Sequence, residues 1–185
     1  MRTFIAIDIL PQASILNFFQ NLQQELSDSK INWVNPKIFH LTLAFLGEIE
    51  EPNSSLIKEN LKKIAGQQSA FEIEVNGFGY FGSIQQPKVL WVGIIPNDKL
   101  SGLQSKISVE LKQLGIQIEE RQFHPHITLG RAKSNVDVQK LKTLVSEYSC
   151  FKFQNSYVKE IIFYESMLRP QGPIYKPIET FSLLD

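Results

Sequence analysis

Hydrophobic residues recur along this chain with two different periods, and each period predicts one type of element. Strict alternation, or a short apolar run rich in β-branched residues, is typical of a strand. Spacing of three or four residues is typical of an amphipathic helix. The first pattern predicts strands at residues 3–9, 40–47, 71–75, 88–95, 124–131 and 157–166.

Helical spacing separates these predicted strands. The first predicted helix covers residues 12–27, where leucine and phenylalanine recur at helical intervals. A second is expected to begin near Pro52 and to end at Gly66, and Gly115 is expected to end a third. The apolar positions that predict the last three helices are Leu56, Ile57, Leu61 and Ile64; Leu100, Leu103, Ile107, Leu111 and Leu114; and Val138, Leu141, Leu144 and Val145.

Glycine and proline punctuate the remaining segments. Three glycines follow the predicted strand at 71–75 and predict a flexible turn before the next strand. Prolines after residue 166 predict an irregular tail, and the alternating residues 179–184 predict an edge strand at its end. These glycines and prolines are Gly77, Gly79, Gly82, Pro170, Pro173 and Pro177.

The second half of the chain repeats the order of elements in the first half. A shift of 86 positions, the distance from His40 to His126, also lays Thr42 on Thr128. The same shift lays Ile5 on Trp91, Ile9 on Ile95 and Phe71 on Tyr157. This agreement predicts two copies of a strand–helix–strand–helix–strand unit. We expect the two units to pack as similar lobes about a pseudo-two-fold axis, with equivalent strands facing each other across a central cleft.

Composition is that of one ordinary globular domain covering residues 1–185. The chain is 43% hydrophobic and 21% charged. Its single cysteine, Cys150, cannot form an internal disulfide and suits a reducing compartment, so we expect a cytoplasmic protein. No apolar run approaches the ~20 residues that a membrane-spanning helix needs. Nineteen basic and nineteen acidic residues balance, which argues against tight sequence-independent binding along a nucleic-acid backbone. A nucleic-acid substrate would have to be held locally, at an end or a loop.

The two repeated His-x-Thr triplets carry the candidate chemistry. Residues i and i+2 of a strand point to one face, so His40 lies beside Thr42, and His126 beside Thr128. A neutral imidazole can take a proton from an attacking water while a protonated one gives a proton to the leaving oxygen. Histidine suits both roles because its pKa of about 6.5 lies near working pH. Threonine hydroxyls can donate to the phosphate oxygens. Such phosphoester cleavage requires no metal or other cofactor.

Other residues leave alternatives open. A histidine or threonine in a strand is often structural only. His124 and His126 could begin a metal site, although the chain has only one further histidine. Arg131, at the end of the same predicted strand, is either a phosphate ligand or an exposed strand-end arginine. Four aromatic residues are candidates to stack on a base: Trp33, Phe81, Tyr164 and Tyr175. Most aromatic side chains of the chain must nevertheless belong to the core.

The chain resembles the two-histidine (2H) phosphoesterase superfamily, and within it the bacterial and archaeal RNA 2′,3′-cyclic phosphodiesterases once described as 2′-5′ RNA ligases. The resemblance runs through the segments RTFIAIDI, HLTLAFLGEIE, PKVLWVGI, FHPHITLGR and YESMLRPQGPIY. It implies a bilobal α+β fold with antiparallel sheets and a positively lined cleft. It also implies that His40 donates and His126 accepts a proton as a cyclic phosphate opens to a 2′-phosphomonoester. Thr42 and Thr128 would then bind phosphate, and Arg131 matches an arginine often found after the second motif.

Several functional alternatives stand beside this interpretation. Pseudo-symmetry lets the roles of the two histidines reverse with the orientation of the substrate. The same cleft could hold an RNA end or a nucleotide without catalysis, or could open a small cyclic nucleotide such as ADP-ribose 1″,2″-cyclic phosphate. Weak reverse 2′-5′ RNA ligation is a possible side activity. We expect a monomer that needs no protein partner.

Overall fold

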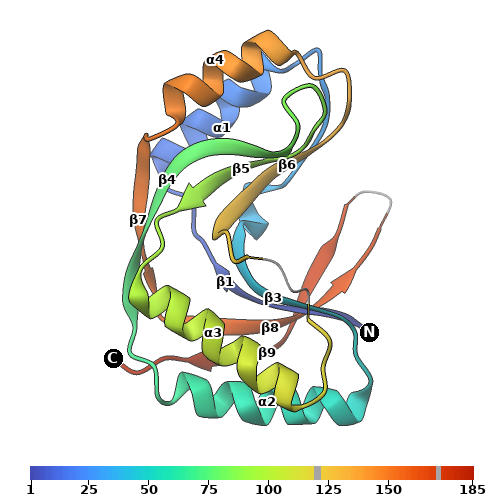
Figure 1. The fold of residues 1–185 in the computed structure, drawn as a ribbon, viewed down its shortest axis with the longest axis vertical. Helices are drawn as coiled ribbons and strands as arrows, with labels where there is room; N and C mark the ends of the chain where they lie inside the picture. The colour runs from blue at the N-terminus through green and yellow to red at the C-terminus, as the bar shows by residue number, and fades with distance from the viewer. Residues whose placement is uncertain (119–121, 170–171) are drawn as a thin grey trace.

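The fold is α+β, in a computed structural model that describes residues 1–118, 122–169 and 172–185. Within these residues, four α-helices and a short 3₁₀ helix are distributed among nine strands (Figure 1). In chain order the elements are β1 (Arg2–Asp8), α1 (Ala13–Glu25), β2 (Lys30–Trp33), the 3₁₀ helix Pro36–Ile38, β3 (His40–Glu48), α2 (Glu51–Ala65), β4 (Phe71–Gly82), β5 (Pro87–Ile94), α3 (Asp98–Gln113), β6 (His126–Ser134), α4 (Val138–Tyr148), β7 (Lys152–Val158), β8 (Glu160–Met167) and β9 (Ile174–Ser182).

The strands form one antiparallel sheet in the order β7-β4-β5-β6-β3-β1-β8-β9, and β2 pairs with β6 beside this path. At the centre of the sheet β3 pairs with β6 through Leu41 and Ile127. These two positions lie 86 residues apart and are therefore equivalent in the two halves of the chain. An antiparallel pair between equivalent positions is what a two-fold axis through the pair produces. The predicted duplication thus appears in the structure as a pseudo-two-fold axis between Leu41 and Ile127.

Each lobe takes elements from both halves of the chain. At one end of the molecule, α1 contacts β7 and α4 contacts β4 (Figure 1). At the other end, α2 packs against α3, β8 and β9, and α3 also contacts β3. The expectation of one repeated unit in each lobe was therefore wrong, because the last long strand of each half crosses over. Strand β4 pairs with β5 of the second half, and β8 pairs with β1 of the first half.

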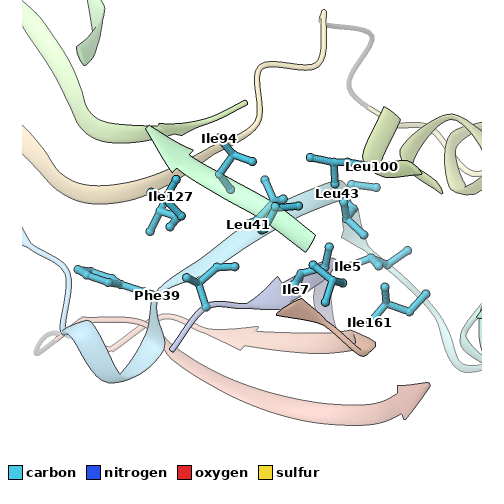
Figure 2. Close-up of a cluster of buried hydrophobic side chains, with 14 of the residues drawn as sticks. Ile5, Ile7, Phe39, Leu41, Leu43, Ile94, Leu100, Ile127 and Ile161 are labelled. Atoms are coloured by element: carbon cyan, nitrogen blue, oxygen red, sulfur yellow. The ribbon is translucent and has the colours of Figure 1, made fainter. Parts of the chain in front are cut away.

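A continuous apolar core joins the two lobes. Leu41 and Ile127 lie inside it, and both are almost fully buried. Figure 2 shows their side chains among residues from both halves of the chain. The labelled neighbours are Ile5 and Ile7 of β1, Phe39 and Leu43 of the β3 region, Ile94 of β5, Leu100 of α3 and Ile161 of β8.

Local sequence explains where two of the described helices begin. The Asn97 side chain accepts a hydrogen bond from the backbone N–H of Leu100 and caps α3. Asp137 Oδ1 accepts hydrogen bonds from the N–H groups of Gln139 and Lys140 and caps α4. None of the described helices is long and apolar enough to cross a membrane.

Three expectations about strands need correction. The segment with Gly77, Gly79 and Gly82 is not a turn, because β4 continues through it to pair with β5. Strand 157–166 is two strands, β7 and β8, which separate at Lys159 and pair with different partners. The expected strand 124–131 begins two residues later, at His126.

The alignment of β1 on β5 was also wrong, by one residue. Ile5 corresponds to Leu90, because Ile5 pairs with Ala44 and Leu90 pairs with Gly130, 86 residues later, and both side chains are fully buried in the core. Trp91, on which the 86-residue shift laid Ile5, points to the opposite face beside Thr128. A shift of one position along a strand exchanges its two faces. The predicted edge strand at the end of the chain is confirmed as β9, which pairs only along β8 in the sheet order. Pro170 lies outside the described residues.

Candidate active site

Both His-x-Thr triplets begin strands at the junction of the lobes, His40 at the start of β3 and His126 at the start of β6. Leu41 and Ile127 point into the core, so the histidines and threonines point to the other face of the sheet. We call this the site face, defined by His40, Thr42, His126 and Thr128. All four side chains are half-buried.

The two triplets lie side by side and run in opposite directions. Leu41 faces Ile127 in an antiparallel pair. The same register, carried one residue to either side, sets His40 opposite Thr128 and His126 opposite Thr42. Opposed residues of an antiparallel pair lie on the same face. Two imidazoles and two hydroxyls from distant parts of the chain thus lie together on the site face.

The backbone before each strand orients its imidazole in the same way. His40 Nδ1 lies 2.8 Å from the carbonyl oxygen of Ile38, and His126 Nδ1 lies 2.6 Å from that of His124. A carbonyl oxygen can only accept, so Nδ1 carries the proton and donates in both contacts. This leaves Nε2 of each neutral ring as the nitrogen without a proton. A neutral Nε2 can accept a proton, and a protonated Nε2 can donate one.

Burial is the main influence on the charge of both rings. It lowers the pKa of His40 and of His126 below the ordinary histidine value, because a desolvated imidazole is harder to charge. The hydrogen bonds to the two carbonyl oxygens oppose this and raise each pKa. The positive charge of Arg131 lowers both pKa values. The charge of His40 also lowers the pKa of His126, so a charge on one ring disfavours a charge on the other.

A β-bulge explains why Arg131 acts on the site. Strict alternation from Ile127 would turn Arg131 toward the core. In β6, however, Thr128 pairs with Trp91 and Gly130 pairs with the next residue, Leu90, which leaves Leu129 as an extra residue. The bulge changes the alternation, and Arg131 is exposed opposite Val89. Its charge therefore reaches both imidazoles.

Comparison with known proteins agrees with this duplicated geometry. The sequence model of the LigT like phosphoesterase family matches the chain twice, at residues 7–91 and at residues 92–175. The chain belongs to the LigT-like phosphoesterase family. As a member it is a hydrolase of phosphodiester bonds of the cyclic phosphodiesterase type.

Several relatives of this phosphoesterase match over nearly their whole length. An RNA 2′,3′-cyclic phosphodiesterase of Thermotoga maritima is 36% identical over 178 residues, which are 95% of this chain and 92% of the relative. One of Archaeoglobus fulgidus is 34% identical over 183 residues, which are 98% and 99% of the two chains. A crystal structure from Thermus thermophilus superposes with a TM-score of 0.81 at 25% identity, covering 99% of this chain and 98% of that one. Apo LigT of E. coli has the same fold, with a TM-score of 0.75 at 24% identity, and covers 100% of this chain and 98% of its own.

Aromatic rings flank each imidazole of the phosphoesterase. Phe4 and Tyr175 lie 5.2 and 5.1 Å from His40 between ring centroids. Phe81 lies 4.9 Å from His126, edge to face, and Trp91 lies 6.3 Å from it. Of the four aromatic residues considered from the sequence, Phe81 and Tyr175 thus border the site face, and Tyr164 stacks on Phe4 beside it. The fourth, Trp33, packs against the core beside Phe19.

Sequence reasoning missed Phe4, Trp91 and Asp8. Asp8 lies opposite His40 in the β1–β3 pair, and its negative charge raises the pKa of His40. The Tyr164 hydroxyl donates to both Asp8 carboxylate oxygens, at 2.9 and 2.8 Å. Asp8 occurs in an apolar segment 32 positions before His40 in the sequence, so only the pairing of β1 with β3 connects them.

His124 contributes its backbone to the site. Its carbonyl oxygen accepts the hydrogen bond from His126, while its own side chain is exposed. Among the described residues, no group of three or more His, Cys, Asp or Glu side chains could hold a metal ion.

Proposed function

We propose that this phosphoesterase opens 2′,3′-cyclic phosphates at RNA ends to 2′-phosphomonoesters, with His40 as proton donor and His126 as proton acceptor. The observation that supports this most directly is the mirrored pair of Nδ1 hydrogen bonds, which leaves both Nε2 atoms free on one face. The relatives named RNA 2′,3′-cyclic phosphodiesterase support the substrate class.

The proposed reaction balances with these two rings. Neutral Nε2 of His126 takes a proton from a water that attacks phosphorus. The bond between phosphorus and the 3′-oxygen breaks, and protonated Nε2 of His40 gives that oxygen its proton. The product is a 2′-phosphomonoester with a free 3′-hydroxyl. Thr42 and Thr128 donate hydrogen bonds to the non-bridging oxygens, and Arg131 offsets their negative charge.

Replacement of either histidine tests the paired roles. His40→Ala and His126→Ala should each lower kcat/KM on a cyclic-phosphate oligonucleotide by about 10²- to 10⁴-fold, the range typical of general acid–base residues. Phosphorus NMR of the product should show a 2′-phosphomonoester for the wild type. His124→Ala keeps the backbone carbonyl, so its loss should be far smaller. An unchanged rate in either of the first two variants would refute the proposal.

A chelator tests the proposal that the reaction needs no metal. Because the two imidazoles supply both proton transfers, the rate should persist when the protein and substrate are dialysed against EDTA and assayed in its presence. Complete loss of the rate, restored by a divalent cation, would contradict the metal-free mechanism.

A panel of substrates separates the alternatives. Tight binding of a cyclic-phosphate oligonucleotide without turnover would favour a non-catalytic binding module. Faster opening of ADP-ribose 1″,2″-cyclic phosphate than of RNA ends would favour a small cyclic nucleotide. Joining of RNA ends through a 2′-5′ bond would reveal the reverse reaction. The cytoplasmic location, the monomeric state and the single domain over residues 1–185 stay predictions.

A further inference from the structure

The pseudo-two-fold axis relates the two histidines, so their surroundings can be compared position by position. Equivalent positions flank the two rings, yet the residues at these positions differ. Asp8 lies opposite His40 on β1, and Gly93 lies opposite His126 on β5. A Cβ atom at Gly93 would lie 2.8 Å from the carbonyl oxygen of Asn76, so the backbone leaves no room for a carboxylate there. Among the described strand pairs, the cross-strand neighbour on β1 or β5 is acidic for His40 and not for His126.

Tyr164, the hydrogen-bond partner of Asp8, also has no equivalent beside His126. Tyr164 lies opposite Phe4 in the β1–β8 pair and donates to both oxygens of Asp8. The equivalent of Phe4 on β5 is Val89, and the residue opposite Val89 is Phe81. Phe81 presents a ring of the same kind but has no hydroxyl. Both members of the Asp8–Tyr164 pair are thus present beside one histidine and absent beside the other.

We propose that Asp8 and Tyr164 act as a positioning pair that makes His40 the proton donor and so breaks the symmetry of the two histidines. This inference rests on the proposed function and deepens it. A carboxylate near an imidazole favours the protonated ring. His126 receives no such help, and it is the ring that must be neutral to accept a proton.

Tyr164 holds the carboxylate in place. Its side chain is buried, and its ring stacks on Phe4 with centroids 5.1 Å apart. Phe4 in turn contacts the His40 ring. Asp8 itself is exposed, so without the two hydrogen bonds its carboxylate could turn into solvent. Burial, and then Asp8, raise the pKa of Tyr164 far above its ordinary value, so the phenol stays a neutral donor at every working pH.

Other groups also act on His40 and set the background for the test. From β6, Arg131 lowers the pKa of His40. The Ile38 carbonyl oxygen raises it, and the neutral ring of Tyr175 on β9 lies edge to face against the imidazole. None of these three groups carries a full negative charge, which Asp8 supplies.

The direct test is an NMR titration of the imidazole resonances, assigned with histidine variants. Asp8→Asn keeps the shape of the side chain and an acceptor for Tyr164 but removes the charge. We expect the pKa of His40 to fall, and that of His126 to change much less. The matched control is Glu160→Gln, since Glu160 is an exposed carboxylate on β8 whose charge acts on Tyr164. It should leave the His40 pKa close to the wild-type value.

Tyr164→Phe tests the anchoring role separately. It should lower the pKa of His40 by less than Asp8→Asn does, and the double variant should match Asp8→Asn alone, because the phenol acts through the carboxylate. If Tyr164 only packs and does not position the carboxylate, Tyr164→Phe would lower the melting temperature and leave the His40 titration unchanged. That result would refute the anchoring role. An unchanged His40 pKa in Asp8→Asn, or an equal fall for both histidines, would overturn the proposal.

Kinetics links the titration to the reaction. In Asp8→Asn the maximum of kcat/KM should move to lower pH, and each unit of fall in the donor pKa lowers the rate above that pKa about tenfold. Glu160→Gln should keep the wild-type profile. The titration does not depend on turnover, so a wild-type protein without cyclic phosphodiesterase activity would refute the proposed function alone. A shifted titration with an unshifted rate profile would refute the donor assignment.

Discussion

Each imidazole of this phosphoesterase is held by the backbone that immediately precedes it. A carbonyl oxygen two residues earlier accepts from Nδ1 of His40 and of His126, which selects the tautomer with a free Nε2. Burial then lowers both pKa values, and Arg131 lowers both further. The local chain therefore determines which nitrogen of each neutral ring carries the proton, while burial and neighbouring charges determine how readily each ring takes a second one.

The lowered pKa values predict an acidic optimum for kcat/KM. The rate should rise with pH as His126 loses its proton and fall as His40 loses its proton. Its maximum lies midway between the two pKa values. Both lie below the ordinary histidine value of about 6.5, so the maximum should lie below about pH 6.5 as well. The pH profile of kcat/KM, with controls for the buffer, measures this optimum. A plateau that extends above about pH 8 would contradict the prediction.

Removal of the Arg131 charge should shift the pH optimum in the direction opposite to that expected for Asp8→Asn. Because its positive charge lowers both histidine pKa values, Arg131→Gln should raise both and move the optimum to higher pH. The same variant should raise KM, since the guanidinium is proposed to bind phosphate. An optimum that stays in place while KM rises would restrict Arg131 to binding.

At the scale of elements, bulges and glycines aim the side chains of the site. The bulge in β6 turns Arg131 to the site face, and one in β3 lies where Ile5 pairs with Ala44 and Ala6 pairs with Thr42. In β4, Gly79 lies opposite Trp91, whose ring covers the space that a side chain would occupy. The absence of a side chain at Gly79 thus leaves room for the Trp91 ring beside His126.

Gly79→Ala should displace the Trp91 ring. A Cβ atom at this position would lie 2.5 Å from Trp91 Cζ2, far inside normal contact. We expect a loss of about 1–3 kcal/mol in the free energy of unfolding, typical of overpacking, together with a lower kcat/KM. Gly102→Ala in α3 is the matched control, because nothing lies within 4 Å of its added Cβ. It should stabilise the protein by about 0.5–1 kcal/mol. Denaturant unfolding measures both, and equal effects would contradict the steric argument.

At the scale of the whole molecule, the two lobes share strands, helices and core. Each lobe contains one helix of each half, and β4 and β8 pair across the halves. The lobes meet where Leu41 pairs with Ile127, inside the common core. This interleaving predicts that neither half of the chain can fold into a lobe by itself.

Leu41→Ala should destabilise both lobes together. Leu41 is 1% exposed, and truncation of such a buried leucine costs about 2–5 kcal/mol of unfolding free energy. We expect a lower melting temperature with a single transition, seen at the same midpoint by circular dichroism and by tryptophan fluorescence. Leu56→Ala, an exposed position on α2, should change stability little. Two separate transitions in the wild type would contradict one cooperative unit.

Much of the element order could be predicted from the sequence, because hydrophobic periodicity is a local property. All four helices are confirmed, and the strands at His40 and Phe71 begin at the predicted residues. The errors arose where tertiary pairing overrides local pattern. Glycines that were predicted to form a turn are part of β4 because β5 pairs along them. The segment at Lys159 divides because β7 and β8 join different partners, which no local pattern records.

The sequence by itself determined which side chains are candidates for the chemistry of this protein. An imidazole and a hydroxyl two residues apart must share a face of a strand, and the repeat of that triplet indicates two such faces. Only the tertiary structure decided what surrounds each ring. Asp8, Tyr164 and Phe4 reach His40 through pairing of β1 with β3 and β8, and a bulge brings Arg131 onto the site face. The physical reason is that side-chain direction along a strand is set locally, whereas cross-strand neighbours depend on register between segments far apart in the chain.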